Sequence, residues 1–258
     1  MASPTPSSAT SPVESVDRAL VVLQVLARAG ARGMGLAELA SELRVNKSTV
    51  HRALAALRFR GFVTQDPASG GYVLGPSATQ LAEDFFGDEN LPVLLHSALV
   101  ALSGVAQELV HLGVLSGTHV VYLDKVEPER SVRVWSAVGR RSPAVTTALG
   151  RAMLAFRGTD RSALAGYVRA VGEGRAVDPE HVWDALEHAR ARGYATEVEE
   201  NEAGISCIAV PVLRGGTAIA AVSVTAPAER MTTERVEQLH AEMREVLPQL
   251  LPTGLHLP

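Results

Sequence analysis

Apolar residues in the N-terminal quarter of the chain recur at helical spacing, with short breaks between the helical stretches. In the first stretch, four apolar residues fall on one helical face: Val16, Leu20, Leu23 and Ala27. Gly30 and Gly33 predict the end of this helix. A shorter helix is expected over residues 36–43 and, after a turn at 44–46, a third over 47–60.

Two short runs with high strand propensity follow the third helix, which is expected to end at Gly61. They cover residues 62–64 and 72–74, and turn-forming residues fill the segment 65–71 between them. Three helices and a hairpin in this order predict a winged helix-turn-helix. A further helix is expected over 76–86.

The third helix has two contrasting faces. Val50, Leu54 and Leu57 share the side that must face a core, whereas Ser48 and Arg52 lie opposite. The segment from residue 44 to residue 60 contains five cations and no carboxylate. Such a helix can enter the major groove of DNA and present side chains to base edges. The competing interpretation is a three-helix structural module with a solvated basic face.

The residues expected to contact double-stranded DNA come from this helix, its N-cap and the hairpin. They are Asn46, Lys47, Ser48, Thr49, His51, Arg52, Arg58 and Tyr72. Lys47 and the helix N-terminus are expected to hold phosphate, and the hairpin around Tyr72 is expected to be the wing.

Beyond residue 91 the pattern changes to a mixture of strands and helices. A helix over 92–108 precedes strand-like runs at 109–115, 119–126 and 132–138, and two helices are expected over 148–156 and 179–192. The apolar runs 207–213 and 218–225 predict a hairpin near the centre of a sheet, and a last helix begins with Thr233 as its N-cap. Strands joined by tight turns predict an α+β domain with a mainly antiparallel sheet flanked by helices.

The chain is therefore expected to contain two domains and a connecting helix. We predict a disordered tail over residues 1–14, the winged helix-turn-helix over 15–75, a linker helix over 76–91 and the second domain over 92–258.

Charge and cysteine content narrow the class of protein. A formal net charge of −4 excludes a protein that coats nucleic acid through general positive charge, although a local basic face remains possible. Cys207 is the one cysteine, so an internal disulfide and an all-cysteine metal site are excluded. Neither a secretion signal nor an apolar run of about 20 residues occurs, so we expect a cytoplasmic protein with no membrane partner.

Catalytic motifs are missing from the second domain. It has no Gly-x-Ser-x-Gly elbow, phosphate loop or His-x-x-x-His spacing, and Cys207 opens an apolar strand without an evident base beside it. Most of the acidic residues between 197 and 202 are expected to form a solvated loop. We therefore expect no enzyme activity, no cofactor and no metal.

Several segments, in the same order, resemble the IclR-type bacterial regulators. In the first domain these are residues 15–20 (SVDRAL), 36–40 (LAELA) and 46–54 (NKSTVHRAL). In the second they are 139–143 (GRRSP), 147–155 (TALGRAMLA), 192–195 (RGYA), 199–200 (EE), 204–212 (GISCIAVPV) and 221–227 (AVSVTAP). The resemblance implies a winged helix joined to a GAF-like effector domain.

The same resemblance implies a pocket for a small organic effector, a carboxylate or an aromatic compound. Matched by motif, its lining is Thr147, Ala148, Leu149, Gly150, Glu197, Ile205, Cys207, Ser223 and Thr225. Small, weakly polar side chains on neighbouring strands, with free amides at a helix start, suit such a ligand. The alternative is that these small residues only permit close packing of a helix on the sheet.

Together these patterns predict a transcriptional regulator, in this family most often a repressor, that binds a palindromic operator as a homodimer or a dimer of dimers. Its operator affinity would respond to the effector. Two alternatives remain: a ligand-independent regulator whose second domain serves only assembly, and an enzyme fused to a DNA-binding module.

Overall fold

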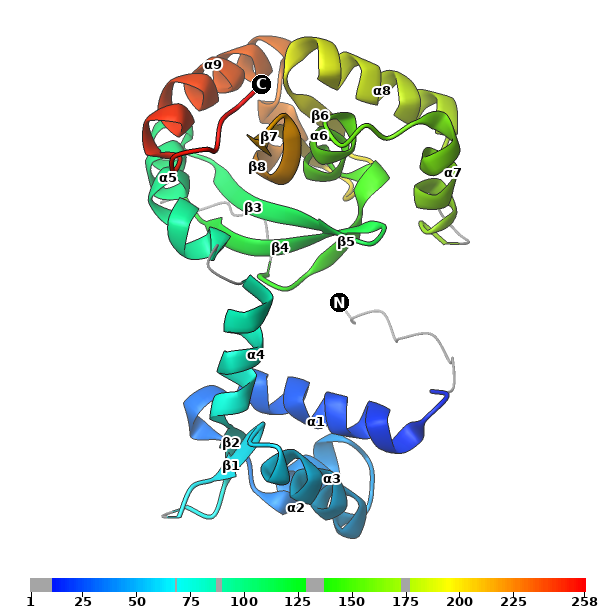
Figure 1. Ribbon diagram of the computed structural model, residues 1–258, viewed down its shortest axis with the longest axis vertical. Coiled ribbons are helices and arrows are strands. Elements are labelled where there is room, and N and C mark those ends of the chain that lie inside the picture. Colours follow the sequence, from blue (N-terminus) through cyan, green and yellow to red (C-terminus); the bar gives the residue numbers. More distant parts are fainter. Residues whose placement is uncertain (1–10, 68, 87–89, 129–136, 173–176) are drawn as a thin grey trace. The chain divides into compact units, whose positions relative to one another are not determined.

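The computed structural model describes residues 11–67, 69–86, 90–128, 137–172 and 177–258 (Figure 1). The chain divides into two compact units, Met1–Glu89 and Asn90–Pro258, each with its own hydrophobic core. The predicted disordered tail over 1–14 lies outside the described residues as far as residue 10, and the first helix begins at Glu14.

Unit 1 contains the three helices and the hairpin that the sequence predicts. In chain order the elements are α1 (Glu14–Ala29), η1 (Gly30–Arg32), α2 (Leu36–Glu42), α3 (Lys47–Phe59), β1 (Val63–Gln65), β2 (Tyr72–Leu74) and α4 (Pro76–Phe86). Strands β1 and β2 pair antiparallel, and an isolated bridge joins Tyr72 to Met34. The fold of this unit is a helix-turn-helix with a β-hairpin wing.

The apolar face of α1 divides between core and solvent. Val22, Val25 and Leu26 are buried in the core of unit 1. The stripe read from the sequence lies partly outside that core, because Val16 and Leu20 are 56% and 54% exposed. Helical spacing finds an apolar face but does not show which part of it another element covers.

Unit 2 is built on one six-stranded sheet. Its elements are α5 (Leu91–Ala106), β3 (Leu109–Ser116), β4 (His119–Val126), β5 (Arg141–Pro143), η2 (Ala144–Thr146), α6 (Ala148–Ala155), α7 (Arg161–Arg169), α8 (Pro179–Arg192), β6 (Ala195–Val198), β7 (Ile205–Arg214), β8 (Thr217–Pro227), η3 (Ala228–Arg230) and α9 (Thr233–Leu250). The strand order is β5-β4-β3-β8-β7-β6, with antiparallel neighbours throughout. The predicted α+β fold and the hairpin near the sheet centre are confirmed.

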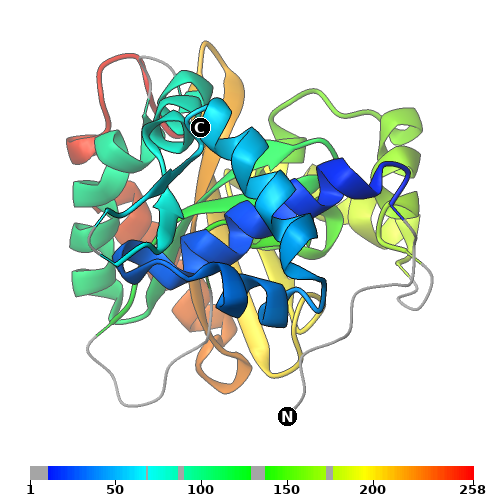
Figure 2. The same cartoon turned by 90° about the horizontal axis from the view of Figure 1, so that it is seen from below.

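Helices cover both faces of this sheet. Helices α5 and α9 pack on one face, where Ile208, Val210 and Val222 enter the core. Helices α6 and α8 lie on the other, against Ala209 and Ala221. Figure 2 shows the orange strands β7 and β8 between these two groups of helices. Alternation along the strands thus directs one set of residues to each core.

Some predicted elements need correction. The last helix is capped by Thr232, whose side chain accepts the N–H of Arg235, and not by Thr233. Helix α7 and strands β5 and β6 were missed, because short elements with few buried residues carry little periodic signal. The predicted strand over 132–138 lies almost entirely outside the described residues.

Candidate functional sites

The start of α3 is organised by Asn46. Its Oδ1 atom accepts the backbone N–H of Thr49 at 2.9 Å and the hydroxyl groups of Ser48 and Thr49 at 2.9 and 2.5 Å. A side-chain N-cap of this kind fixes where the helix begins. Asn46 therefore orients the first turn of α3 and restrains both neighbouring hydroxyl groups.

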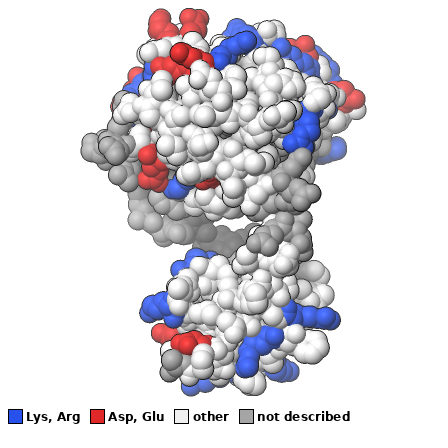
Figure 3. Space-filling model, turned by 60° about the vertical axis from the view of Figure 1, so that its left-hand side comes forward, with Lys and Arg blue, Asp and Glu red and all other residues white. Residues whose placement is uncertain are grey.

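The exposed side of α3 is cationic. Val50, Leu54 and Leu57 are buried as the helical wheel predicts, which leaves Lys47, His51 and Arg52 exposed. Among the described residues, no ion pair engages Arg44, Lys47, Arg52 or Arg60. Lys and Arg predominate among the charged residues of unit 1 on the face drawn in Figure 3. These cations are free to meet phosphates or base edges.

Arg58 has a different position from the other cations. Its Nη1 donates to the side chain of Gln65 on β1 at 3.2 Å, and the amide of Gln65 donates to the carbonyl of Gly70 at 2.9 Å. The residues from 64 to 71 include no Lys or Arg. Arg58 thus links α3 to a wing that has no cation of its own.

Tyr72 does not belong to the exposed DNA surface. Its side chain is 6% exposed and packs in the core of unit 1, and its backbone N–H and carbonyl both bond to Met34. The sequence interpretation was wrong for this residue. The hairpin does form, but the strand alternation turns the ring of Tyr72 inward.

The start of α6 is the first part of the predicted effector site. Thr147 caps the helix by accepting the N–H of Gly150 at 3.1 Å, and its hydroxyl donates to the carbonyl of Ala144 at 3.3 Å. All the residues from 147 to 150 are buried. A Cβ added to Gly150 would lie 2.1 Å from the oxygen of Ala144, so only glycine fits there.

The second part is a polar area on the sheet face that α6 covers. Glu197, Cys207 and Thr225 occupy the same register across β6, β7 and β8. The sulfur of Cys207 lies 3.2 Å from the hydroxyl oxygen of Thr225. Ser223 is buried on β8 two residues before Thr225, and it pairs with His111 on β3. Ile205 precedes Cys207 by two residues, so it shares this face.

His111, Tyr122 and Ser142 also belong to this area, although the sequence interpretation did not select them. Nδ1 of His111 lies 3.4 Å from the hydroxyl oxygen of Thr225, and its ring meets Tyr122 edge-on at 4.9 Å between centroids. Ser142 on β5 is buried. A histidine inside an apolar run, at an alternating position, was the signal available for the first of them.

Burial favours the neutral forms of His111, Tyr122 and Cys207. Burial first, and then the positive charges of Lys125 and Arg140, lower the pKa of His111 to about 3. Burial raises the pKa of Tyr122 to about 12 and raises the pKa of the Cys207 thiol as well. A neutral thiol is a poor nucleophile, so this area suits hydrogen bonding better than covalent chemistry.

Glu197 is not part of a solvated loop. Its side chain is 2% exposed on β6, and Oε1 accepts the N–H groups of Glu200 and Asn201 at 2.6 and 2.9 Å. Burial raises the pKa of its carboxyl group, although these hydrogen bonds oppose the shift. The placement of Glu197 in a loop was therefore wrong, because it lies on β6.

A groove of about 890 Å³ lies beside α8 and β6. Its lining includes Thr146, Arg151, His181, Glu197 and Glu200, but not Cys207, Ser223 or Thr225. Within the described part of the chain, no group of three or more His, Cys, Asp or Glu residues is placed to hold a metal ion. No described helix is long and apolar enough to cross a membrane.

Family models match both parts of the chain. Residues 15–67 match the IclR helix-turn-helix domain, and residues 89–250 match the C-terminal part of the bacterial transcriptional regulator IclR. A glycerol operon regulatory protein of Streptomyces coelicolor is 36% identical, over 86% of this chain and 88% of that protein.

Two solved structures are similar throughout. The Thermotoga maritima IclR structure gives a TM-score of 0.70 at 27% identity and covers 92% of this chain and 97% of its own. An IclR homologue from Microbacterium hydrocarbonoxydans, in complex with 4-hydroxybenzoate, gives a TM-score of 0.68 at 22% identity. The latter covers 92% of this chain and 98% of its own.

Proposed function

Because the chain belongs to the IclR family of bacterial transcriptional regulators, we propose that α3 reads an operator and that unit 2 adjusts operator affinity when a small organic molecule binds to it. The observation that carries the first part is the exposed face of α3, with its unpaired cations and fixed N-terminus. The proposed contacts are Asn46, Lys47, Ser48, Thr49, His51, Arg52 and Arg58. Burial removes Tyr72 from this set.

The role of each residue follows from its position. Arg52 projects from the middle of the exposed face, where a guanidinium group can reach a guanine edge. Lys47 lies in the first turn, where its charge and the helix N-terminus favour phosphate. Arg58 would act through the wing, because it is bonded to Gln65.

Arg52→Ala tests the DNA-binding part. Operator fragments are first recovered by sequencing the DNA that co-purifies with the protein. We expect a loss of about 1–3 kcal/mol in operator binding and a weaker preference for operator over random DNA. Arg28→Ala, which removes an exposed cation outside α3, is the control and should leave that preference unchanged. An unchanged preference in Arg52→Ala would exclude α3 as the reader.

The polar area of unit 2 supports the effector part. It offers the hydroxyl groups of Ser223 and Thr225, the Cys207 thiol and the Glu197 carboxyl group on one sheet face. Helix α6, with the amides at its start, packs on the same face. We propose a small hydroxylated acid whose carboxylate meets the helix N-terminus and whose hydroxyl group meets Thr225 or Glu197. The related structure that contains 4-hydroxybenzoate holds a ligand of this chemistry.

Thr225→Val tests this assignment with little change in shape. It removes the hydroxyl group that contacts Cys207 and His111. The probes are 4-hydroxybenzoate, glycerol and a panel of short hydroxy acids, added during operator titrations. We expect normal operator binding without a probe and a weakened response with it, whereas Thr217→Val, at the exposed start of β8, responds like the wild type. A full response in Thr225→Val would place the effector elsewhere.

Self-association completes the proposal. Val16 and Leu20 on α1 and Val13 directly before it are exposed, as are Val93 and Val100 on α5, and apolar patches of this kind favour protein interfaces. We therefore propose a homodimer, or a dimer of dimers, that acts on a palindromic operator in the cytoplasm, with repression as the expected sign. If no probe changes operator affinity, unit 2 serves assembly only.

A further inference from the structure

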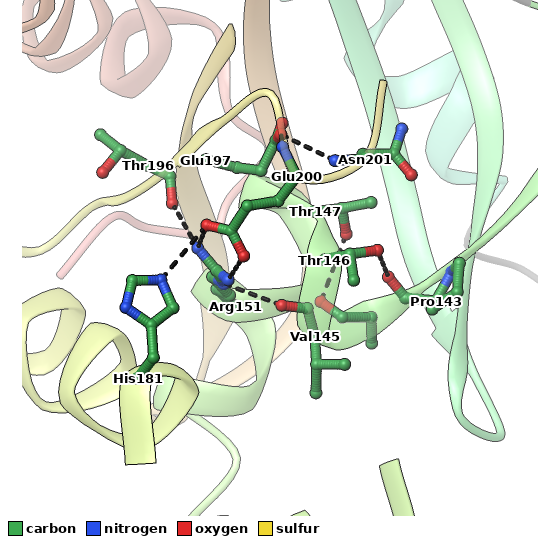
Figure 4. A network of polar contacts seen from close by, with 11 residues as sticks. Pro143, Val145, Thr146, Thr147, Arg151, His181, Thr196, Glu197, Glu200 and Asn201 are labelled. Atoms are coloured by element: carbon green, nitrogen blue, oxygen red, sulfur yellow. Dashed lines mark hydrogen bonds and ion pairs between the residues drawn. The ribbon is translucent and has the colours of Figure 1, made fainter. Parts of the chain in front are cut away.

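Arg151 is an unusual residue for the interior of unit 2. It lies on α6, and its side chain is 2% exposed. Nε donates to the carbonyl of Val145 at 2.9 Å, and Nη1 donates to the carbonyl of Thr196 at 3.2 Å. The guanidinium group also meets both carboxylate oxygens of Glu200, with Nη1 at 2.8 Å from Oε1 and Nη2 bonded to Oε2 (Figure 4).

This guanidinium group joins segments that are distant in sequence. Val145 belongs to η2, directly before the Thr147 cap of α6. Thr196 and Glu200 lie on β6 and in the turn after it. One buried cation therefore connects the start of α6 with the turn over residues 199–204, here called the acidic turn.

The acidic turn is also hydrogen-bonded to Glu197 on β6. Glu197 Oε1 accepts the backbone N–H of Glu200 and of Asn201. The backbone of Glu200 is thus bonded to Glu197, while its side chain is bonded to Arg151. Glu200 thus lies between Arg151 and the Glu197 carboxyl group, with a hydrogen bond to each (Figure 4).

A buried ion pair is an inefficient way to gain stability. Removing two charges from water cancels much of their attraction, and apolar residues of similar volume often stabilise a fold as well. The planar guanidinium group of arginine fixes the directions of its hydrogen bonds, whereas lysine offers only a point charge. The bonds of Arg151 to Glu200 and to the two carbonyls therefore favour a role in positioning the neighbouring side chains.

We infer that Arg151 is a positioning residue that holds the acidic turn, and with it the carboxyl group of Glu197, against the start of α6, and so sets the effector response without touching the effector. This inference rests on the proposed effector role of unit 2. The guanidinium group bonds Val145, directly before the start of α6, and Glu200, whose N–H bonds Glu197, so it is linked to both halves of that site through one neighbour each.

The groove beside α8 leaves this ion pair partly accessible. Glu200 is 30% exposed, and His181 Nε2 lies 3.4 Å from its Oε1. Burial alone would raise the pKa of Glu200, but the hydrogen bonds and charge of Arg151 outweigh it and lower this pKa. The carboxylate thus stays ionised and paired with Arg151 near neutral pH.

Arg151→Lys in the full chain tests the positioning directly. Hydrogen exchange, measured on short peptides around residues 198–204, reports the amides of Glu200 and Asn201 that bond to Glu197. We expect them to exchange about tenfold faster once the guanidinium group is lost. Glu200→Gln keeps the side-chain volume and should give the same result if Arg151→Lys does not fold.

Arg190→Lys is the matched control. Arg190 is half-buried and, like Arg151, donates to two backbone carbonyls, here those of Ala155 and Thr159, but among the described residues it does not bond to the acidic turn. We expect the peptides around 198–204 to exchange at the wild-type rate in this variant. Wild-type exchange in Arg151→Lys and Glu200→Gln, or equal acceleration in Arg190→Lys, would overturn the inference.

The functional consequence is measured with the probe that acts on the wild type, 4-hydroxybenzoate, glycerol or a hydroxy acid. Arg151→Lys should bind the operator normally without the probe and need about tenfold more of it for the same response. Arg190→Lys should respond like the wild type. A wild-type response in Arg151→Lys overturns the inference. If no probe acts on the wild type, the proposed effector function fails, and hydrogen exchange still decides whether Arg151 holds the turn.

Discussion

At the scale of single residues, His111 makes the stability of unit 2 depend on pH. Its folded pKa of about 3 lies below the ordinary value of 6.5, because burial, Lys125 and Arg140 disfavour the imidazolium form, while Glu127 opposes them. The folded state therefore releases a proton that the unfolded state binds below pH 6.5. The contribution of neutral His111 to the free energy of unfolding is therefore fully present above pH 6.5 and is lost as the pH falls towards 3.

His111→Gln should remove this dependence. Between pH 6 and 5, we expect the free energy of unfolding of the wild type to fall by about 1 kcal/mol more than that of the variant. Residues 1–89 contain no tryptophan and Trp183 lies on α8, so tryptophan fluorescence during urea denaturation does not report unit 1. Equal slopes in the two proteins would mean that the imidazole is not held neutral.

At the scale of elements, the close approach of η2 to α6 depends on one glycine. Gly150→Ala places a methyl group against the backbone of Ala144, and backbone cannot rotate away as a flexible side chain can. We expect a loss of roughly 1–3 kcal/mol in the stability of unit 2, measured by urea denaturation.

Gly166→Ala on α7 is the control for this prediction. A Cβ at Gly166 meets nothing within 4 Å, so the helix should gain about 0.5–1 kcal/mol from the lower conformational entropy of the unfolded chain. Destabilisation of equal size in both variants would show that the contact with Ala144 is not the cause.

At the scale of the whole molecule, each unit has its own core, so unit 1 is expected to fold alone. A fragment of residues 11–86 should bind the operator weakly, because it engages one half-site at a time. The full chain should bind about 10²- to 10⁴-fold more tightly if two copies engage both half-sites. Titrations at one fixed salt concentration compare them. Equal affinities would remove any role for unit 2 in assembly on DNA.

The sequence by itself determined the features that follow from the geometry of a single element. The inward face of α3 and the central hairpin of β7 and β8 follow from helical and strand periodicity, which depends only on neighbouring residues. The order of the motifs was sufficient to indicate the family. The register that brings Glu197, Cys207 and Thr225 together is consistent with the residues that the resemblance selected.

Only the tertiary structure decided which polar residues are buried and what they contact. Arg151 and Glu200 are 49 residues apart, and no local pattern indicates that they pair. Glu197 sits in an acidic run that is typical of a solvated loop, and Tyr72 in a hairpin that is typical of an exposed wing, yet both are buried. A buried charge or ring needs partners from distant segments, and those partners meet only when the chain has folded.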